Sequence, residues 1–309
     1  MTFLALKIDI DTLRGTREGV PNLVEMLRRH GVGATFLFSL GPDHTGRAIR
    51  RAFRPGFMGK VQRTSVVRHY GMRTLLYGTL LPGPDIGTRA GDVMRHVRDE
   101  GFETGVHSWD HTKWQDGVAG AGPAWTQRQM QLACERYHEI FQEPPRVHGA
   151  AGWQMNIHAL RLTQNMGFDY CSDGRGGSPH LPVWNAELIR CAQLPTTLPT
   201  LDELIGMEDV TAYNVADRLL AMTKMPPAQG HVFTLHAELE GMLLAPALDR
   251  LLGGWKAQGY EITSMRRFYE SMQPMALPRH EVGPRSVTGR SGTLLMQGRE
   301  FLGEVDLAA

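Results

Sequence analysis

Cysteine is scarce in this sequence of 309 residues. The three cysteines, Cys134, Cys171 and Cys191, are scattered and odd in number, and no Cys-x-x-Cys pair occurs. A disulfide framework uses an even set of cysteines, and a thiolate metal site uses closely spaced pairs. The sequence therefore supports neither a fold held by disulfides nor a metal bound by thiolates.

Long hydrophobic runs are missing as well. No uncharged stretch reaches the ~18 apolar residues that a transmembrane helix needs. Met1 leads straight into a strand-like run, without the basic region and apolar core of a secretory signal peptide. These absences favour the cytoplasm, with attachment to a membrane surface still open.

Neither sign of charge dominates the composition. The chain has 33 basic and 32 acidic residues, so its net charge of +1 gives no indication of nucleic acid as a partner. After the first strand the sequence reads Asp11-Thr12-Leu13-Arg14-Gly15, not the glycine-rich G-x-G-x-x-G loop of a dinucleotide site. We therefore expect no nucleic acid and no nucleotide cofactor.

What the sequence does have is a regular alternation of apolar strands and amphipathic helices. Such alternation predicts parallel strands with helices outside them. Seven or eight units in a chain of this length favour a distorted (β/α) TIM-like barrel, and an open doubly wound sheet is the alternative. The apolar stripe Val20, Leu23, Val24 and Leu27 predicts a first helix that ends at Gly31. Beyond a first strand that ends near Asp11, we expect strands at residues 34–38, 102–107, near 147, 168–172, 188–194, 231–236 and 260–263, and further helices at residues 92–100, 126–142, 157–166, 214–225, 246–258 and 265–272.

Two stretches interrupt this rhythm. Residues 41–91 form a long insertion. Between His44 and Pro84 it has no Asp or Glu, and basic residues are mixed with apolar ones. This composition is typical of a surface that meets anionic lipid, and a helical cover with its arginines in water is the alternative. Residues 273–309 show little periodicity. We expect them to form a loosely structured tail after a single catalytic barrel at residues 1–272.

Two carboxylates stand at the C-terminal end of the first strand. In the run Ile8-Asp9-Ile10-Asp11 they are two positions apart, so Asp9 and Asp11 share one face of the strand. Side-by-side carboxylates repel each other, and a fold tolerates them mainly when a cation or a proton lies between them. The alternative is a pair of solvated aspartates at a strand end.

Two more strands end in side chains of the same kind. The strand that begins at Phe102 ends in His107-Ser108-Trp109-Asp110-His111, and a later strand ends in His236-Ala237-Glu238. His107 and His111 share a face if the chain turns into a helix after the strand. Two histidines and one carboxylate are a common ligand set for Zn²⁺, Fe²⁺ or Mn²⁺. Since catalytic residues of a barrel lie at the C-terminal ends of its strands, we expect a metal-dependent active site there.

These motifs resemble those of the polysaccharide deacetylase family, the NodB-homology group of carbohydrate esterases. The family's aspartate pair is matched by Asp9 and Asp11, its H-[ST]-x-x-H motif by the run 107–111, and its last motif by Leu235-His236. The resemblance runs from residue 4 to about residue 272 and implies a barrel of the NodB type. It implies that Asp11, His107 and His111 hold one divalent metal ion (Mn, Co or Zn), that Asp9 is the general base, and that His236 is the general acid.

The spacing of the aspartates and the long insertion depart from the usual family pattern. They resemble a branch that deformylates an amino sugar on undecaprenyl phosphate, for aminoarabinose modification of lipid A and resistance to polymyxin and cationic antimicrobial peptides. The resemblance implies a polyprenyl-phosphate-linked sugar and an anionic membrane surface as partners, at the cytoplasmic face of the bacterial inner membrane. The segments that carry it are residues 8–21, 150–153, 172–176, 198–200 and 236–238.

One family feature is missing. The family often has an arginine that orients the catalytic aspartate, but residues 147–153 contain no arginine. We therefore expect Arg175 to contact the base or the lipid-linked phosphate, with Asp173 fixing it; a salt bridge within the loop is the alternative. We also expect Trp109 and Trp153 to line the sugar pocket and Glu238 to hydrogen-bond His236 or the sugar amine. Core positions for the tryptophans and a solvated Glu238 are the alternatives.

Two other functions compete with this interpretation. A deacetylase or cyclic amidase with a soluble substrate would use the same metal chemistry, but it would not need a basic and apolar insertion. A non-catalytic barrel that binds glycan or lipid would not need Asp9 and His236 together. We therefore favour metal-dependent hydrolysis of an amide C–N bond.

Overall fold

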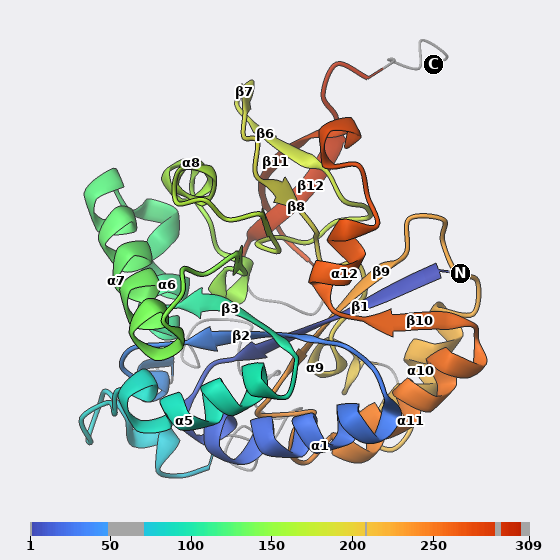
Figure 1. The fold of residues 1–309 in the computed structure, drawn as a ribbon, viewed down its shortest axis with the longest axis horizontal. Helices are drawn as coiled ribbons and strands as arrows, with labels where there is room; N and C mark the ends of the chain where they lie inside the picture. The colour runs from blue at the N-terminus through green and yellow to red at the C-terminus, as the bar shows by residue number, and fades with distance from the viewer. Residues whose placement is uncertain (1, 49–70, 208, 288–291, 304–309) are drawn as a thin grey trace.

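An eight-stranded parallel sheet organises the fold (Figure 1) in a computed structural model that describes residues 2–48, 71–207, 209–287 and 292–303. Strand β1 (Thr2–Ile10) pairs with β2 (Thr35–Ser39), β9 (His231–His236) and β10 (Tyr260–Thr263). After β2 the sheet continues through β3 (Glu103–Ser108), β4 (Val147–His148), β5 (Tyr170–Cys171) and β8 (Ala192–Gln193).

The sheet curls until its two ends meet. The Thr197 backbone N–H, just beyond β8, donates to the Val232 carbonyl of β9 at 3.0 Å. The hydroxyls of Thr196 and Thr234 are 2.6 Å apart across the same junction. The expected barrel is therefore confirmed in its distorted form, with a few side-chain and backbone bonds in place of a full ladder at the junction.

Helices cover the outside of the curled sheet (Figure 1). In α1 (Val20–His30) an apolar stripe is buried, and Gly31 ends the helix in the left-handed conformation that glycine adopts readily. Helix α5 (Ile86–Asp99) begins after Asp85, whose side chain caps the Thr88 N–H. The other helices are α6 (His111–Gly117), α7 (Pro123–Phe141), α8 (Ile157–Asn165), α9 (Leu201–Leu204), α10 (Val215–Met222), α11 (Ala245–Ala257) and α12 (Met265–Glu270).

The two faces of β1 have different environments. Leu4, Leu6, Ile8 and Ile10 belong to the core between the sheet and its helices. The alternate residues point into the curl, where Ala5 packs with apolar side chains from the other strands. Further along this inner face the side chains become polar, so β1 carries charged groups into the barrel interior.

The C-terminal stretch corrects one expectation. Residues 273–309 were expected to be a loose tail, but they contain β11 (Arg279–Arg285) and β12 (Leu294–Glu300). These strands form a second sheet with β6 (Leu181–Trp184) and β7 (Glu187–Leu188). Local periodicity does not report such pairing, because the partners of β11 and β12 include a strand about a hundred residues earlier.

Other boundaries differ in smaller ways. The strand expected at residues 188–194 is interrupted: it contains the last residue of β7 and the whole of β8. The insertion expected at 41–91 ends at residue 85, directly before α5, and residues 49–70 of it lie outside the described residues. None of the helices in the described part of the chain combines the length and hydropathy needed to span a membrane.

Candidate active site

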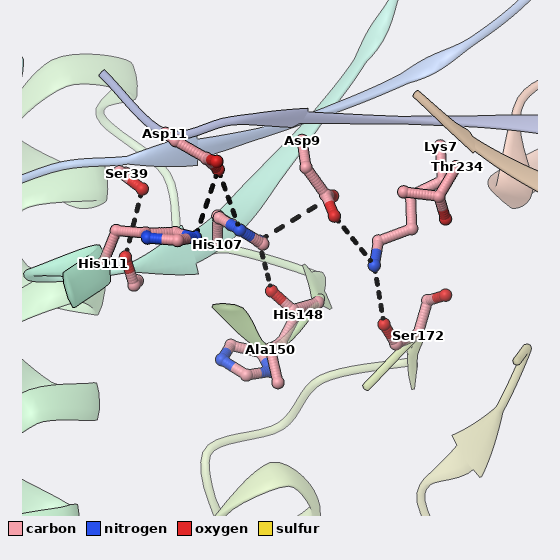
Figure 2. Close-up of polar contacts among 12 residues, drawn as sticks. Lys7, Asp9, Asp11, Ser39, His107, His111, His148, Ala150, Ser172 and Thr234 are labelled. Carbon is pink, nitrogen blue, oxygen red and sulfur yellow. Dashed lines mark hydrogen bonds and ion pairs between the residues drawn. The ribbon is translucent and has the colours of Figure 1, made fainter. Parts of the chain in front are cut away.

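Three side chains from the C-terminal ends of β1 and β3 and from the start of α6 converge at one edge of the sheet (Figure 2). Asp11 follows β1, His107 lies in β3, and His111 opens α6. The Nε2 atoms of both histidines are 3.3 Å from Asp11 Oδ1, and one ligand atom from each residue lies within 4.8 Å of the others. The structure thus brings together the three residues that the sequence proposed as metal ligands.

The imidazole of His107 is held by a bond to the backbone, and the position of His111 is set by the start of α6. His107 Nδ1 lies 2.7 Å from the Gly149 carbonyl and, as the donor, leaves the Nε2 lone pair facing Asp11. His111 depends on the turn from β3 into α6, which Asp110 caps by accepting from the Lys113 N–H at 3.0 Å. The other Asp110 oxygen is 2.6 Å from His44 Nδ1. The protein itself therefore orients the His107 imidazole and fixes the backbone that carries His111.

The environment of Asp11 fits a divalent cation. Its Oδ1 atom is buried and accepts no hydrogen bond, although two imidazole nitrogens lie beside it. Burial alone would raise the pKa of this carboxyl, but His111, His107 and His236 outweigh burial and lower the pKa. One ionised oxygen facing two nitrogen donors is a donor set that Zn²⁺ and related transition metals accept.

Asp9 lies next to this group but has a different partner. Its Oδ2 atom is 3.2 Å from Lys7 Nζ, and its Oδ1 atom is 3.7 Å from His107 Nδ1. Asp9 Oδ1 is buried and accepts no hydrogen bond. One carboxylate of the pair therefore faces the histidines, whereas the other is turned toward a lysine and keeps one oxygen free.

His236 is the last residue of β9 and is the register partner of Asp9 in the neighbouring strand. Its Nδ1 atom is buried without a hydrogen-bond partner. Its backbone N–H donates to Glu240 Oε2 at 2.8 Å. A carboxylate and an imidazole thus stand beside each other on adjacent parallel strands, near the Asp11 group.

Comparisons with known proteins show the family to which a chain with these residues belongs. A family model described as "Polysaccharide deacetylase" matches residues 4–171, which include both aspartates and the run His107–His111. The chain belongs to the polysaccharide deacetylase family. It is therefore a hydrolase of amide bonds, as the motifs indicated.

Relatives of this deacetylase-family chain include two named deformylases. A Shewanella sediminis protein named "Probable 4-deoxy-4-formamido-L-arabinose-phosphoundecaprenol deformylase ArnD" is 35% identical over 96% of the chain and 95% of its own length. A Wigglesworthia glossinidia brevipalpis protein of the same name is 30% identical over 92% of the chain and 98% of its own length. The crystal structure of a polysaccharide deacetylase homologue from Mycobacterium smegmatis has a TM-score of 0.59 at 17% identity, covering 93% of this chain and 94% of that one. This last likeness supports the fold.

Glu238 has a different place from the one expected for it. The sequence suggested a contact with His236 or with the sugar amine, or a solvated position. Instead Glu238 is buried, and its Oε1 atom accepts from the Asp11 and Thr12 backbone N–H groups at 3.1 and 2.9 Å and from the Thr12 hydroxyl at 2.7 Å. Burial and the nearby charge of Asp11 raise the pKa of Glu238 to about 8. Glu238 therefore fixes the backbone that carries Asp11.

Gly15 makes this contact possible. A Cβ atom at Gly15 would lie 2.0 Å from Glu238 Oε1, so a larger residue would displace the carboxyl group. The glycine was part of the segment Ile8–Pro21 that carried the family resemblance. The structure gives a physical reason for a glycine at position 15, because the carboxyl group of Glu238 occupies the space that a side chain would fill.

Glu240 gives a pH-dependent prediction. Burial, together with the charge of Asp202, raises the pKa of Glu240 from 4.5 to about 8. A raised folded-state pKa contributes stability below the unfolded pKa, and this stability is lost as the pH rises toward the folded pKa. Relative to Glu240→Gln, the wild-type free energy of unfolding should therefore fall by about 1.4 kcal/mol per pH unit within that window.

Urea unfolding of both proteins at several pH values between the two pKa values measures this difference. The glutamine keeps an acceptor for the His236 N–H, so the comparison isolates the titration of the carboxyl group. Parallel stability curves for the two proteins would contradict the prediction.

Arg175 also needs a correction. We expected Asp173 to fix it, but its guanidinium donates to both oxygens of Glu203, with Nη1 2.8 Å from Oε1, and to the Leu198 carbonyl at 3.1 Å. Asp173 instead accepts from the Ala150 N–H at 3.0 Å and contacts His148 Nδ1 at 2.6 Å. Sequence proximity suggested the wrong partner, because Arg175 points to the segment that leads into α9.

The two tryptophans differ in exposure. Trp153 is 2% exposed, and its indole N–H donates to the Thr196 hydroxyl at 3.1 Å, which favours the core alternative for this residue. Trp109 is half-buried and packs against Gly41, with the Arg136 guanidinium 5.3 Å from its ring centre. A role for Trp109 in the sugar pocket stays a prediction.

Sequence reasoning missed Lys7. Only the two aspartates of the first strand were considered as candidate site residues, so the lysine within it received no role. Lys7, Asp9 and Asp11 follow one another at intervals of two, which places all three on one strand face. A charged residue on the inner face of a buried strand was the available signal.

Proposed function

We propose that this chain hydrolyses the formamide of 4-deoxy-4-formamido-L-arabinose-phosphoundecaprenol, releasing formate and the free amino sugar lipid. The observation that carries the proposal is the 35% identity to a named deformylase over 96% of this chain. This similarity extends well beyond the family motifs, into the segments after residue 171 where the family model ends. The role in lipid A modification, and hence in resistance to cationic peptides, follows from that substrate.

In this proposal Asp11, His107 and His111 hold one divalent cation, with Mn, Co and Zn as the candidates. When bound, the cation polarises the amide oxygen and makes water more acidic. The geometry of the donor set supports the assignment, since a carboxylate oxygen without a hydrogen bond lies 3.3 Å from the Nε2 atoms of both histidines. Glu238 supports it indirectly by fixing the Asp11 backbone.

Asp9 is the proposed general base. Its Oδ1 atom is free of hydrogen bonds and lies beside the Asp11 group, so it is available to accept the proton of the attacking water. His236 is the proposed general acid. An amine leaves only if its nitrogen is protonated as the C–N bond breaks, and an imidazolium next to the base can supply that proton. The register pairing of Asp9 with His236 supports a division of labour between the two.

A peripheral position at the cytoplasmic face of the inner membrane completes the proposal. In the described part of the insertion, Met72 and Leu80 are 66% and 81% exposed. Apolar side chains beside arginines, in a segment without acidic residues, suit contact with an anionic lipid surface. The carrier phosphate would then meet the basic insertion, while the formamido group reaches Asp9 and His236.

Formate release from the purified formamido sugar lipid tests the function. We expect a chelator to abolish release and Mn²⁺, Co²⁺ or Zn²⁺ to restore it, because a bound cation would polarise the amide carbonyl of the substrate. The matched control substrate is the acetamido analogue of the same lipid. Release of acetate at an equal or greater rate would favour a deacetylase, and no turnover with any metal would contradict the proposal.

A further inference from the structure

Lys7 is a buried cation in the middle of the first strand. Its side chain is 0% exposed, and its ammonium donates to the Ser172 carbonyl at 3.0 Å and lies 3.2 Å from Asp9 Oδ2 (Figure 2). Burying an ammonium group is costly unless it is paired and hydrogen-bonded. The partner that offsets this cost is the carboxylate assigned as the base.

The side chain of Lys7 is packed closely between Trp153 and Gly149. Its ammonium lies 5.4 Å from the centre of the Trp153 ring, within the range of a cation–π contact. A Cβ atom at Gly149 would come within 2.9 Å of Lys7 Cε, so the backbone after β4 packs directly on the lysine stem. The carbonyl of the same Gly149 is the acceptor that orients His107. One backbone position thus contacts both the lysine and a proposed metal ligand.

Arg175 holds other partners. It lies on Trp153 with its guanidinium 5.1 Å from the ring centre, and its Nη1 and Nη2 groups donate to Glu203 and to the Leu198 carbonyl. The ammonium group 3.2 Å from Asp9 Oδ2 therefore belongs to the same strand as Asp9 itself.

We propose that Lys7 is the positioning residue for Asp9. By holding Oδ2, Lys7 keeps the carboxylate from rotating toward Asp11, where it would become a further metal ligand, and leaves Oδ1 for the proton of water. This inference rests on the proposed function for its substrate, but the placement of Asp9 does not depend on which amide is cleaved.

Removal of the charge gives the first test. With the formamido sugar lipid, Lys7→Met should lower kcat by about 100-fold, the loss expected when a catalytic group is misplaced by about 1 Å. KM should change by less than about twofold, because binding of the lipid does not involve Lys7. Lys7→Arg should keep kcat within about tenfold of wild type, since a guanidinium retains the charge and the donors. Lys7→Gln also removes the charge but keeps a hydrogen-bond donor. It should show the same loss of kcat and serves as the test if Lys7→Met does not fold.

Two further measurements separate this proposal from the proposed function. The first is hydrolysis of 4-nitrophenyl formate, whose good leaving group needs no general acid and no sugar recognition. A wild type that cleaves this ester but not the lipid overturns the substrate, while the Lys7 series can still be read on the ester. The second is Co²⁺ binding, since a carboxylate released from Lys7 should change the visible Co²⁺ spectrum in Lys7→Met and not in Lys7→Arg.

The matched control is Lys224→Met, which removes an exposed lysine and should leave all readouts unchanged. Full activity of Lys7→Met would overturn the positioning role. So would an equal loss in Lys7→Met and Lys7→Arg with unchanged Co²⁺ spectra in both, because that pattern indicates a structural defect only.

Discussion

Asp9→Asn is expected to lower kcat for formamide hydrolysis by about 10³- to 10⁴-fold and to leave metal binding intact. The amide cannot accept a proton from water, and general-base catalysis contributes at most about this factor. Metal binding should persist because the three proposed ligands lie together without Asp9. Formate release and bound Mn²⁺ or Zn²⁺, measured on the same samples, check both parts.

The control for this substitution is Asp249→Asn, on the outer helix α11, where the aspartate contacts His30 and Arg29. It removes a carboxylate of the same kind and should leave kcat unchanged. If Asp9→Asn loses its metal and Asp11→Asn retains it, the roles of the two aspartates are reversed. Asp9→Asn should also unfold at a lower temperature, because it leaves the buried Lys7 unpaired.

His111→Asn is the second large expected effect. We expect its affinity for the divalent cation to fall by about 100-fold or more, since even partners behind a ligand contribute about 10- to 100-fold. Formate release should then be lost at limiting metal and return in part at excess metal. His111 suits the test because it is half-buried at the start of α6, whereas His107 is fully buried and bonded to Gly149.

Calorimetric titration with Zn²⁺ or Mn²⁺ measures this affinity. The matched control is His138→Asn on α7, an exposed histidine, which should bind metal as the wild type does. An unchanged affinity in His111→Asn would show that the cation does not bind between Asp11 and the two histidines.

The fold could be predicted where one segment carries its own signal. The apolar stripe and terminal Gly31 of α1 predicted a helix that the structure contains. Helix α5 was expected six residues too late, because Gly87 and Gly91 weaken the stripe and the Asp85 cap was not recognised. Strands β11 and β12 were missed for another reason. Their stability comes from pairing with each other and with β6, and pairing is a property of the assembled sheet.

The site was predictable to the same extent. Strand ends identified Asp11, His107 and His111 as neighbours, since parallel strands bring their C-terminal ends to one edge. The direction in which each side chain points, and its hydrogen-bond partner, were not predictable. Glu238 was placed at the right edge but bonds to the Asp11 backbone, and Arg175 turns to Glu203. Such choices depend on which acceptor lies within hydrogen-bond distance in the folded chain, and a motif does not contain this distance.

The position of β1 also affects how the chain is made. A ribosome delivers β1, β2 and β3 early, and with them both aspartates and the two histidines. Strand β9, which carries His236 and pairs with β1 along six residues, lies more than two hundred residues after β1 in the chain. Contacts between such distant segments form slowly, and until then one edge of β1 is unpaired. An unfinished chain can therefore assemble the proposed metal ligands while it still lacks the proposed proton donor.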